Sequence, residues 1–270
     1  MTRLQQQKGF TLVELAIVIT IIGLLIGGIL KGRQLMENAR VTATIQGLKG
    51  VETAALTFED TYGFKPGDMP GNGKIPGCGP GCDLSTTFKD GRIGVASWPM
   101  VQPEVDTTVA AATGTKQETY FFWYDMGATG LISGINGTAP ITGAPAFGPD
   151  FPTAKWGGGI VVMESDGAQT GARASGTVTI TGTVLAIVMS PTAAFDTPFT
   201  SGTYVLTPAL AEQIDRKMDD AKSGNGPVQA FGNVGCTGTP GMGGMVASPT
   251  STYTTADPAR DCGLYVELGS

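Results

Sequence analysis

Histidine is absent from the 270 residues of the chain. Because histidine is the commonest general base and metal ligand near neutral pH, Ser-His-Asp and Cys-His nucleophile arrangements are excluded. Positive charge is also scarce, since 17 lysines and arginines face 23 acidic residues. The resulting negative field repels phosphate backbones, so we expect no nucleic-acid partner. We also expect a protein that is not an enzyme.

Proline is missing from residues 1–65, and charge is almost missing from residues 10–30. The latter stretch, FTLVELAIVITIIGLLIGGIL, holds one charged residue, Glu14, among 21. About 20 apolar residues cross the hydrocarbon core as a helix, so the pattern predicts a membrane span. The preceding residues contain Arg3 and Lys8 and no acid, which by the positive-inside rule predicts a cytoplasmic N-terminus and an exported remainder.

Two ordinary interpretations of this span leave something unexplained. A cleaved secretory signal has an apolar region of about 7 to 15 residues and a small-residue cleavage site, and this sequence has neither. A plain membrane anchor leaves Glu14 as a penalty of about 2.5 to 3.5 kcal/mol near mid-membrane.

A third interpretation starts from the motif GFTLVE at residues 9–14, with a short basic leader before it and an apolar helix after it. This arrangement resembles the class III signal of type IV pilins and type II secretion pseudopilins. The resemblance implies that a prepilin peptidase removes the leader, residues 1–9, by cleaving between Gly9 and Phe10, and that the new amine of Phe10 is methylated. It further implies partners in other pilins or pseudopilins and in an inner-membrane assembly platform.

The same resemblance offers a partner for the isolated carboxylate. A new ammonium group at Phe10 can pair with Glu14 of the same chain or of a neighbouring subunit, and a buried charge is tolerated when it is paired. Glu14 is then a register mark for assembly. The implied location is the bacterial inner membrane, with a periplasmic head, followed by a pilus or pseudopilus filament.

After the span, the apolar pattern becomes amphipathic. Side chains at steps of three and four lie on one helical face: Ile45, Leu48, Val51, Ala55, Phe58 and Tyr62. We therefore expect a filament-core helix over 10–30 that continues as an amphipathic stem over 31–62, together about 80 Å long. Many type IV pilins carry a proline about twenty residues into the mature chain, and this sequence does not.

Residues 63–270 are expected to form one exported globular head. The segment YGFKPGDMPGNG at 62–73 resembles a turn-rich segment that follows the stem in a subset of pilin-like proteins. Periodicity and composition predict helices over 116–132 and 208–222, and strands or strand-like segments over 158–165, 177–190, 203–207, 228–231 and 262–268. The predicted fold class is α+β, a long N-terminal helix packed on a small antiparallel sheet, as the resemblance also implies.

The aromatic cluster Phe121, Phe122, Trp123 and Tyr124 has two interpretations. Such side chains stack on sugars or bases at some binding surfaces. In a segment with near-helical apolar spacing, packing on the core is favoured.

Four cysteines, Cys78, Cys82, Cys236 and Cys262, would reach an oxidising compartment on export. An even number there favours disulfides, with three possible connectivities. We favour Cys78 with Cys82 and Cys236 with Cys262, because the second pair would close a loop rich in glycine, proline, serine and threonine. That loop also resembles the C-terminal disulfide-bounded loop of pilins. A zinc site built from all four thiolates is the alternative.

Three aspartates, Asp215, Asp219 and Asp220, gather at the end of the predicted helix 208–222. Their hard oxygens next to a glycine-rich turn could hold calcium, as in some major pseudopilins, although the spacing matches no EF-hand and no cofactor is required. A solvated acidic helix end is the simpler interpretation. A glycosidase acid/base pair is a further one that no other sequence feature supports.

Taken together, these features favour a structural filament subunit of a type IV pilus or a type II secretion pseudopilus. The alternative from another class is a membrane-anchored surface module that binds a ligand through its aromatic side chains or its C-terminal loop and does not polymerise. An anchored enzyme is disfavoured by the missing histidines.

Overall fold

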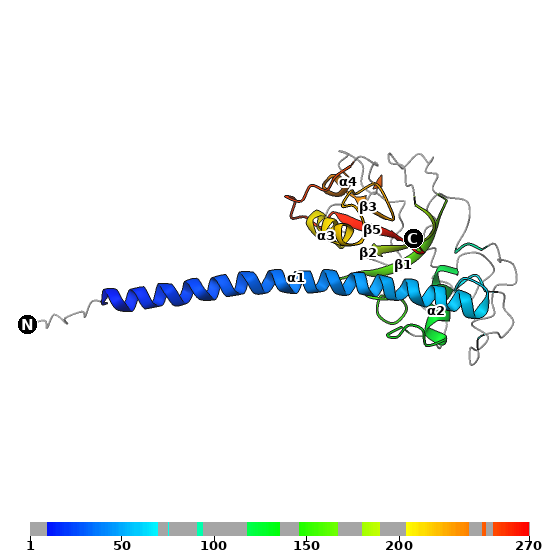
Figure 1. Cartoon of the computed structure of the whole chain (residues 1–270), viewed down its shortest axis with the longest axis horizontal. Coiled ribbons are helices and arrows are strands. Elements are labelled where there is room, and N and C mark those ends of the chain that lie inside the picture. The colour runs from blue at the N-terminus through cyan, green and yellow to red at the C-terminus, as the bar shows by residue number, and fades with distance from the viewer. Residues whose placement is uncertain are drawn as a thin grey trace, which may run out of the picture. The chain divides into compact units, whose positions relative to one another are not determined.

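The computed structural model describes residues 10–69, 75, 91–93, 118–135, 146–166, 180–189, 204–237, 245–246 and 251–269. The chain divides into two compact units, Met1–Thr42 and Ala43–Ser270. The division falls inside the first helix, so the second unit contains the last part of that helix together with the sheet. Figure 1 gives the order and labels of the elements.

Helix α1, Leu12–Tyr62, is a single α-helix of 51 residues, which confirms the continuous helix expected from the apolar run and the amphipathic spacing after it. It ends where Gly63 takes a positive φ of 77° and donates its N–H to the carbonyl of Glu59 at 2.8 Å. A glycine just past the last turn reaches this left-handed conformation without the steric cost of a Cβ.

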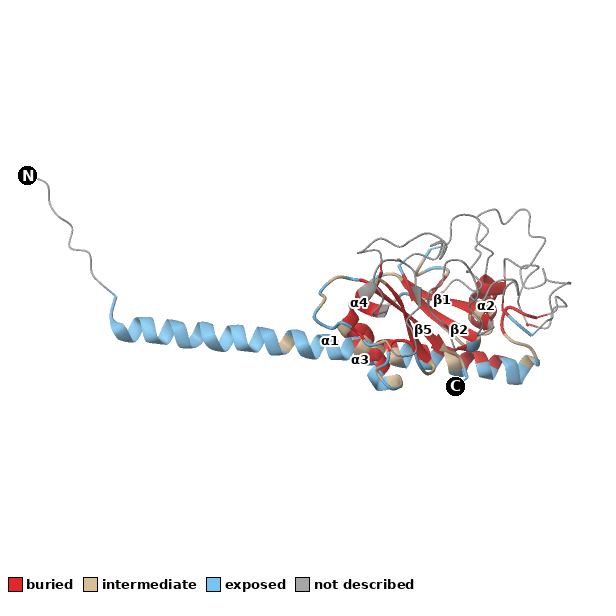
Figure 2. Ribbon diagram, turned by 90° about the horizontal axis from the view of Figure 1, so that it is seen from above, coloured by how far each residue is buried: buried red, intermediate tan, exposed pale blue. Residues whose placement is uncertain are grey.

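Within the second unit, one face of α1 is buried and the other is exposed. Leu48, Val51 and Phe58 are at most 4% exposed, whereas Lys49 and Thr53 are exposed. Figure 2 shows the buried residues in the strands, in α2 and α3, and along this part of α1. The amphipathic face predicted from the three-and-four spacing is therefore the face that packs in the core.

Within the described residues, five strands form one sheet in the order β1-β2-β5-β3-β4. Their bounds are β1, Gly159–Asp166; β2, Thr181–Val188; β3, Val228–Gly232; β4, Met245–Val246; and β5, Cys262–Glu267. All of the neighbouring pairs are antiparallel. The long first helix and the antiparallel sheet confirm the predicted α+β architecture.

The part of the chain that the structure describes contains three further helices: α2, Glu118–Ala128; α3, Pro208–Met218; and α4, Val234–Thr237. In α2 the aromatic side chains of Phe121, Phe122, Trp123 and Tyr124 are all buried, at 8% exposure or less. Core packing is thus confirmed for this cluster, and stacking of sugars or bases on it is ruled out in this fold. Thr207 caps α3, because its Oγ1 accepts the N–H of Leu210 at 3.3 Å and Pro208 occupies the first turn.

Three boundary predictions were wrong. The helix expected over 116–132 ends at Ala128, and Gly130 just beyond it takes a positive φ of 72°. The strand expected over 203–207 is, in its described part, only a bridge between Leu206 and Cys262, because Thr207 already adopts the cap of α3. The helix expected over 208–222 ends at Met218. The aspartate side chains near its end accept backbone N–H groups and so compete with the hydrogen bonds of the helix. Asp215 Oδ1 accepts the N–H of Ala221 at 3.2 Å, at a point where the chain is no longer helical.

The segment at 66–69 follows α1 and packs against α2. Gly67 has a φ of 87° and donates its N–H to Asp125 Oδ2 at 2.8 Å. A Cβ on Gly67 would lie 2.3 Å from the carbonyl oxygen of Glu118. Nearby, Met69 packs in a cluster with Phe58 of α1 and Ile75. Glycine is therefore required at position 67, because both the backbone conformation and the atoms of α2 around it exclude a Cβ.

Candidate functional site: the N-terminal helix end

The first turn of α1 brings together the residues that the sequence motif singled out. Gly9 lies outside the described residues, whereas Phe10 is 92% exposed just before the helix. Thr11 is the residue before Leu12, the first helical residue, and Glu14 is in the first turn. The predicted cleavage position thus directly precedes the helix start.

Glu14 is hydrogen-bonded to Thr11 in both directions. Glu14 Oε2 accepts the backbone N–H of Thr11 at 2.9 Å and the Thr11 hydroxyl at 2.8 Å. The N–H of Glu14 in turn donates to Thr11 Oγ1 at 3.3 Å. This reciprocal pattern is a capping box, which satisfies backbone donors that a helix start otherwise leaves open.

The capping box was missed in the sequence analysis, although a signal for it was present. Thr11-Leu12-Val13-Glu14 has the form Ser/Thr-x-x-Glu before an apolar run, which is the pattern of a helix N-terminus. Its consequence is that the carboxylate of Glu14 has donors in its own chain. Both of these bonds to the carboxylate use the same oxygen, Oε2.

The apolar part of α1 is exposed along its whole length. Among the residues that the structure describes, α1 is the one helix long and apolar enough to cross a membrane, and none of its apolar window is buried inside the protein. Large side chains such as Leu12, Leu24 and Ile29 are 59% to 87% exposed. Such a surface requires lipid or other apolar helices around it.

Residues 4–30 match the family model described as the prokaryotic N-terminal methylation motif. This motif is the class III signal peptide of type IV pilins and pseudopilins, so the resemblance inferred from residues 9–14 is confirmed. Comparisons with curated proteins and with solved structures found no match.

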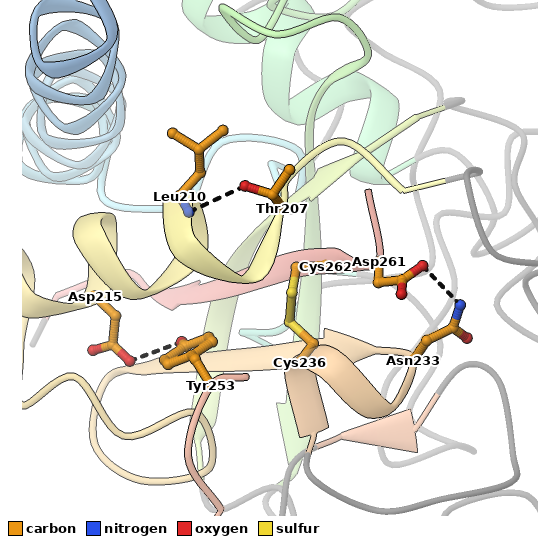
Figure 3. The surroundings of a disulfide bond; sticks show 8 residues. All are labelled: Thr207, Leu210, Asp215, Asn233, Cys236, Tyr253, Asp261 and Cys262. Atoms are coloured by element: carbon orange, nitrogen blue, oxygen red, sulfur yellow. Dashed lines mark hydrogen bonds between the residues drawn. A yellow bond between two sulfur atoms is a disulfide. The ribbon is translucent and has the colours of Figure 1, made fainter. Parts of the chain in front are cut away.

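A disulfide joins Cys236 in α4 to Cys262 at the start of β5, with 5.4 Å between the Cα atoms (Figure 3). Both cysteines are fully buried. Next to the bond, Asn233 Nδ2 donates to Asp261 Oδ1 at 3.0 Å. Because these two sulfurs are bonded to each other, a zinc site that uses all four cysteines is excluded. Cys78 and Cys82 lie outside the described residues, and their pairing stays a prediction.

Replacing Cys236 and Cys262 together by alanine should lower the free energy of unfolding by about 3 to 4 kcal/mol, because the bond closes a loop across 26 residues. Urea unfolding of the full-length protein in detergent measures this difference. Wild-type protein unfolded under reducing conditions should give a value at least as low, because reduction also breaks the predicted bond between Cys78 and Cys82. A loss below about 1 kcal/mol would contradict the expectation that the bond stabilises the head.

The three aspartates predicted as a calcium site do come together, with ligand oxygens within 4.8 Å of one another. Asp215 Oδ2 accepts the Tyr253 hydroxyl at 2.8 Å, as Figure 3 shows. Asp220 accepts the N–H of Lys222 at 2.9 Å and the amide of Asn225 at 3.1 Å. The oxygens of Asp215 and Asp220 therefore already serve as acceptors that hold a turn together.

Calcium takes six to eight oxygen ligands, so it would have to displace some of these bonds. The arrangement as it stands fits a hydrogen-bonded turn better than a calcium cage, and calcium binding at Asp215, Asp219 and Asp220 stays a prediction. Asp215 is fully buried against Tyr253, so it is also poorly placed to meet a sugar substrate.

Two buried carboxyl groups are expected to make stability depend on pH. Burial raises the pKa of Asp125 to about 7, against the opposing hydrogen bond from Gly67. Burial likewise raises the pKa of Asp215 to about 7, against hydrogen bonds from Tyr253 and Ala221. Both carboxyl groups therefore bind a proton more tightly in the folded than in the unfolded chain, where the pKa of aspartate is about 4.

Between about pH 4 and pH 7 the folded state then holds protons that the unfolded state has released, so the free energy of unfolding should fall as the pH rises through this window and level off above it. The expected fall is on the order of a few kcal/mol. Urea unfolding across this range, compared between wild type and Asp125→Asn, isolates the contribution of one group. Asparagine keeps an acceptor for Gly67, so an unchanged slope in this variant would contradict the assignment.

Proposed function

We propose that this chain is a structural subunit of a type IV pilus or a type II secretion pseudopilus. The observation that carries the proposal is the methylation motif at residues 4–30, whose apolar part is the exposed first part of α1. In this proposal the subunit is cleaved after Gly9, methylated at Phe10, stored in the inner membrane with its head in the periplasm, and polymerised through its N-terminal helices.

Glu14 acts in this proposal as the register mark of the polymer. Cleavage creates an ammonium group on Phe10, one residue before the capping box. Within the unassembled chain, Thr11 satisfies one carboxylate oxygen of Glu14. In the polymer, the other oxygen pairs with the ammonium group of a neighbouring subunit, and a subunit placed one helical turn out of register leaves both charges unpaired in an apolar surrounding.

The proposed domain organisation follows from the cleavage after Gly9 and from the membrane span that comes next. The leader is residues 1–9, the filament-core helix is 10–30, the amphipathic stem is 31–62, and the head is 63–270. The partners are further copies, other pilins or pseudopilins, the prepilin peptidase and the assembly platform of the inner membrane. The motif indicates a structural subunit rather than an enzyme.

The non-polymerising surface module is the second candidate, and one observation weakens it. The aromatic side chains of α2 that it would use for a ligand are buried in the core. The candidate then depends on the loop closed by Cys236 and Cys262 alone.

The mass of the N-terminal peptide, measured on protein from its native membrane, tests the proposal. A chain that starts with methylated Phe10 would support prepilin processing. An intact Met1 in cells with an active prepilin peptidase would contradict it and favour a plain anchor. A start beyond Leu30 would mean an ordinary secreted protein.

A further inference from the structure

Basic side chains gather directly after the apolar span. Lys31, Arg33 and Arg40 stand within ten residues, with Glu37 as the one acid among them, in a chain whose formal net charge is −6. All four residues are exposed on α1. The end of the span is therefore a local positive patch in an acidic protein.

The position of the first two bases along the helix matches a membrane boundary. The apolar run from Phe10 to Leu30 rises about 31 Å at about 1.5 Å per residue, and the hydrocarbon core is about 30 Å thick. Lys31 and Arg33 follow within about 5 Å of that limit, where the headgroups begin. Arg40 follows about 15 Å beyond Leu30, past the headgroup layer.

The side chains between these bases also suit an interface. Leu35 and Met36 are each 60% exposed on the same stretch of helix. Large apolar side chains next to lysine and arginine are typical of helical segments that lie at the boundary between acyl chains and headgroups. The stretch from Lys31 to Met36 has this composition.

The position of these bases relative to the span is also unusual. Lysine and arginine are disfavoured on the flank of a span that is moved across the membrane, yet the flank after this span carries three of them. The flank before it carries Arg3 and Lys8, which the proposed cleavage removes. The mature chain would then have bases at one end of its span only, on the exported side.

We propose that Lys31 and Arg33 bind the anionic headgroups of phospholipids in the leaflet that faces the exported head, and so fix the depth of the stored subunit. The proposal rests on the membrane-anchored part of the proposed function and does not require polymerisation. The guanidinium group of Arg33 offers several donors to a phosphate, and the ammonium group of Lys31 adds a second charge. Each base near an anionic surface contributes about a fivefold gain in binding.

Lipid titration of the full-length protein in mild detergent, followed by native mass spectrometry, tests the proposal. The probes are phosphatidylglycerol, which is anionic, and phosphatidylcholine, which has no net charge. Wild type should prefer phosphatidylglycerol, and the double variant Lys31→Gln, Arg33→Gln should bind it about 30-fold more weakly. Arg40→Gln is the matched control, and it should change the affinity less than about threefold because Arg40 lies beyond the headgroups.

Two results would overturn the proposal: equal binding of phosphatidylglycerol by wild type and the double variant, or an equal loss of binding in Arg40→Gln. If the double variant binds lipid normally and also loses filaments, the two bases are assigned to contacts with a second copy. Because the titration uses unassembled protein, a selective loss in the double variant supports the proposal even if the N-terminal mass shows an unprocessed chain.

Discussion

Glu14→Ala is expected to leave cleavage after Gly9 and membrane insertion intact and to abolish filaments. The physical reason is that the substitution removes the only acidic charge of the apolar span, and with it the partner for the ammonium group on Phe10. Removal of the charge also makes the span more apolar, so insertion should not suffer. Sheared-filament yield and the N-terminal peptide mass, measured on the same cells, separate assembly from processing.

A matched variant separates the charge from the helix cap. Thr11→Val removes the hydroxyl that donates to Glu14 and caps the first turn, but it keeps the backbone N–H and the carboxylate. The loss of a cap costs about 1 kcal/mol, so this variant should still assemble, with a reduced yield. Normal filaments from Glu14→Ala would refute the pairing of Glu14 with Phe10, whatever Thr11→Val does.

Gly67→Ala should destabilise the head by at least about 3 kcal/mol. Its φ of 87° is unfavourable for any residue with a Cβ, and the new Cβ would lie 2.3 Å from Glu118 O and 2.9 Å from Phe122 N. Relief of these contacts would move the segment away from α2 and break the hydrogen bond from Gly67 to Asp125. Urea unfolding, or resistance of the head to protease, measures the effect.

Gly63→Ala is the control for this prediction. Gly63 has a similar φ of 77°, but nothing lies within 4 Å of the position where its Cβ would be. Gly63→Ala should therefore lower the free energy of unfolding by about 1 kcal/mol through the backbone conformation alone, with no collision. Equal losses in the two variants would mean that the contact with α2 contributes nothing.

Much of the architecture could be predicted from the sequence because the signals there are local. The apolar run at 10–30 and the amphipathic spacing after it predicted one helix, and α1 spans Leu12–Tyr62. Alternation and β-branched residues predicted the regions of β1 and β2, and Thr207-Pro208 predicted the start of α3. In each case neighbouring residues alone determine the element.

What the sequence did not predict depends on contacts between distant residues. The order of the strands places β5 between β2 and β3, and no local pattern encodes this order. Asp125 is held by Gly67, 58 positions away, and Asp215 by Tyr253, 38 positions away. The early end of α3 has the same origin, because Asp215 there bonds to Ala221 and Tyr253 instead of facing solvent. The Thr11–Glu14 capping box, in contrast, is local and was still missed.

The place of β5 in the sheet has a consequence for the timing of folding. This strand, residues 262–267, follows β2 and β3 in the chain, yet it pairs with β2 on one side and β3 on the other. Until residues 262–267 are in place, β2 and β3 each have an unpaired edge, and Cys236 lacks the partner that it has in the folded head. In the proposed function, in which the head is exported, the sheet is completed only after residues 262–267 have been translocated. A subunit that stalls before this point or loses β5 would present open strand edges, a mark by which proteases and chaperones can remove it.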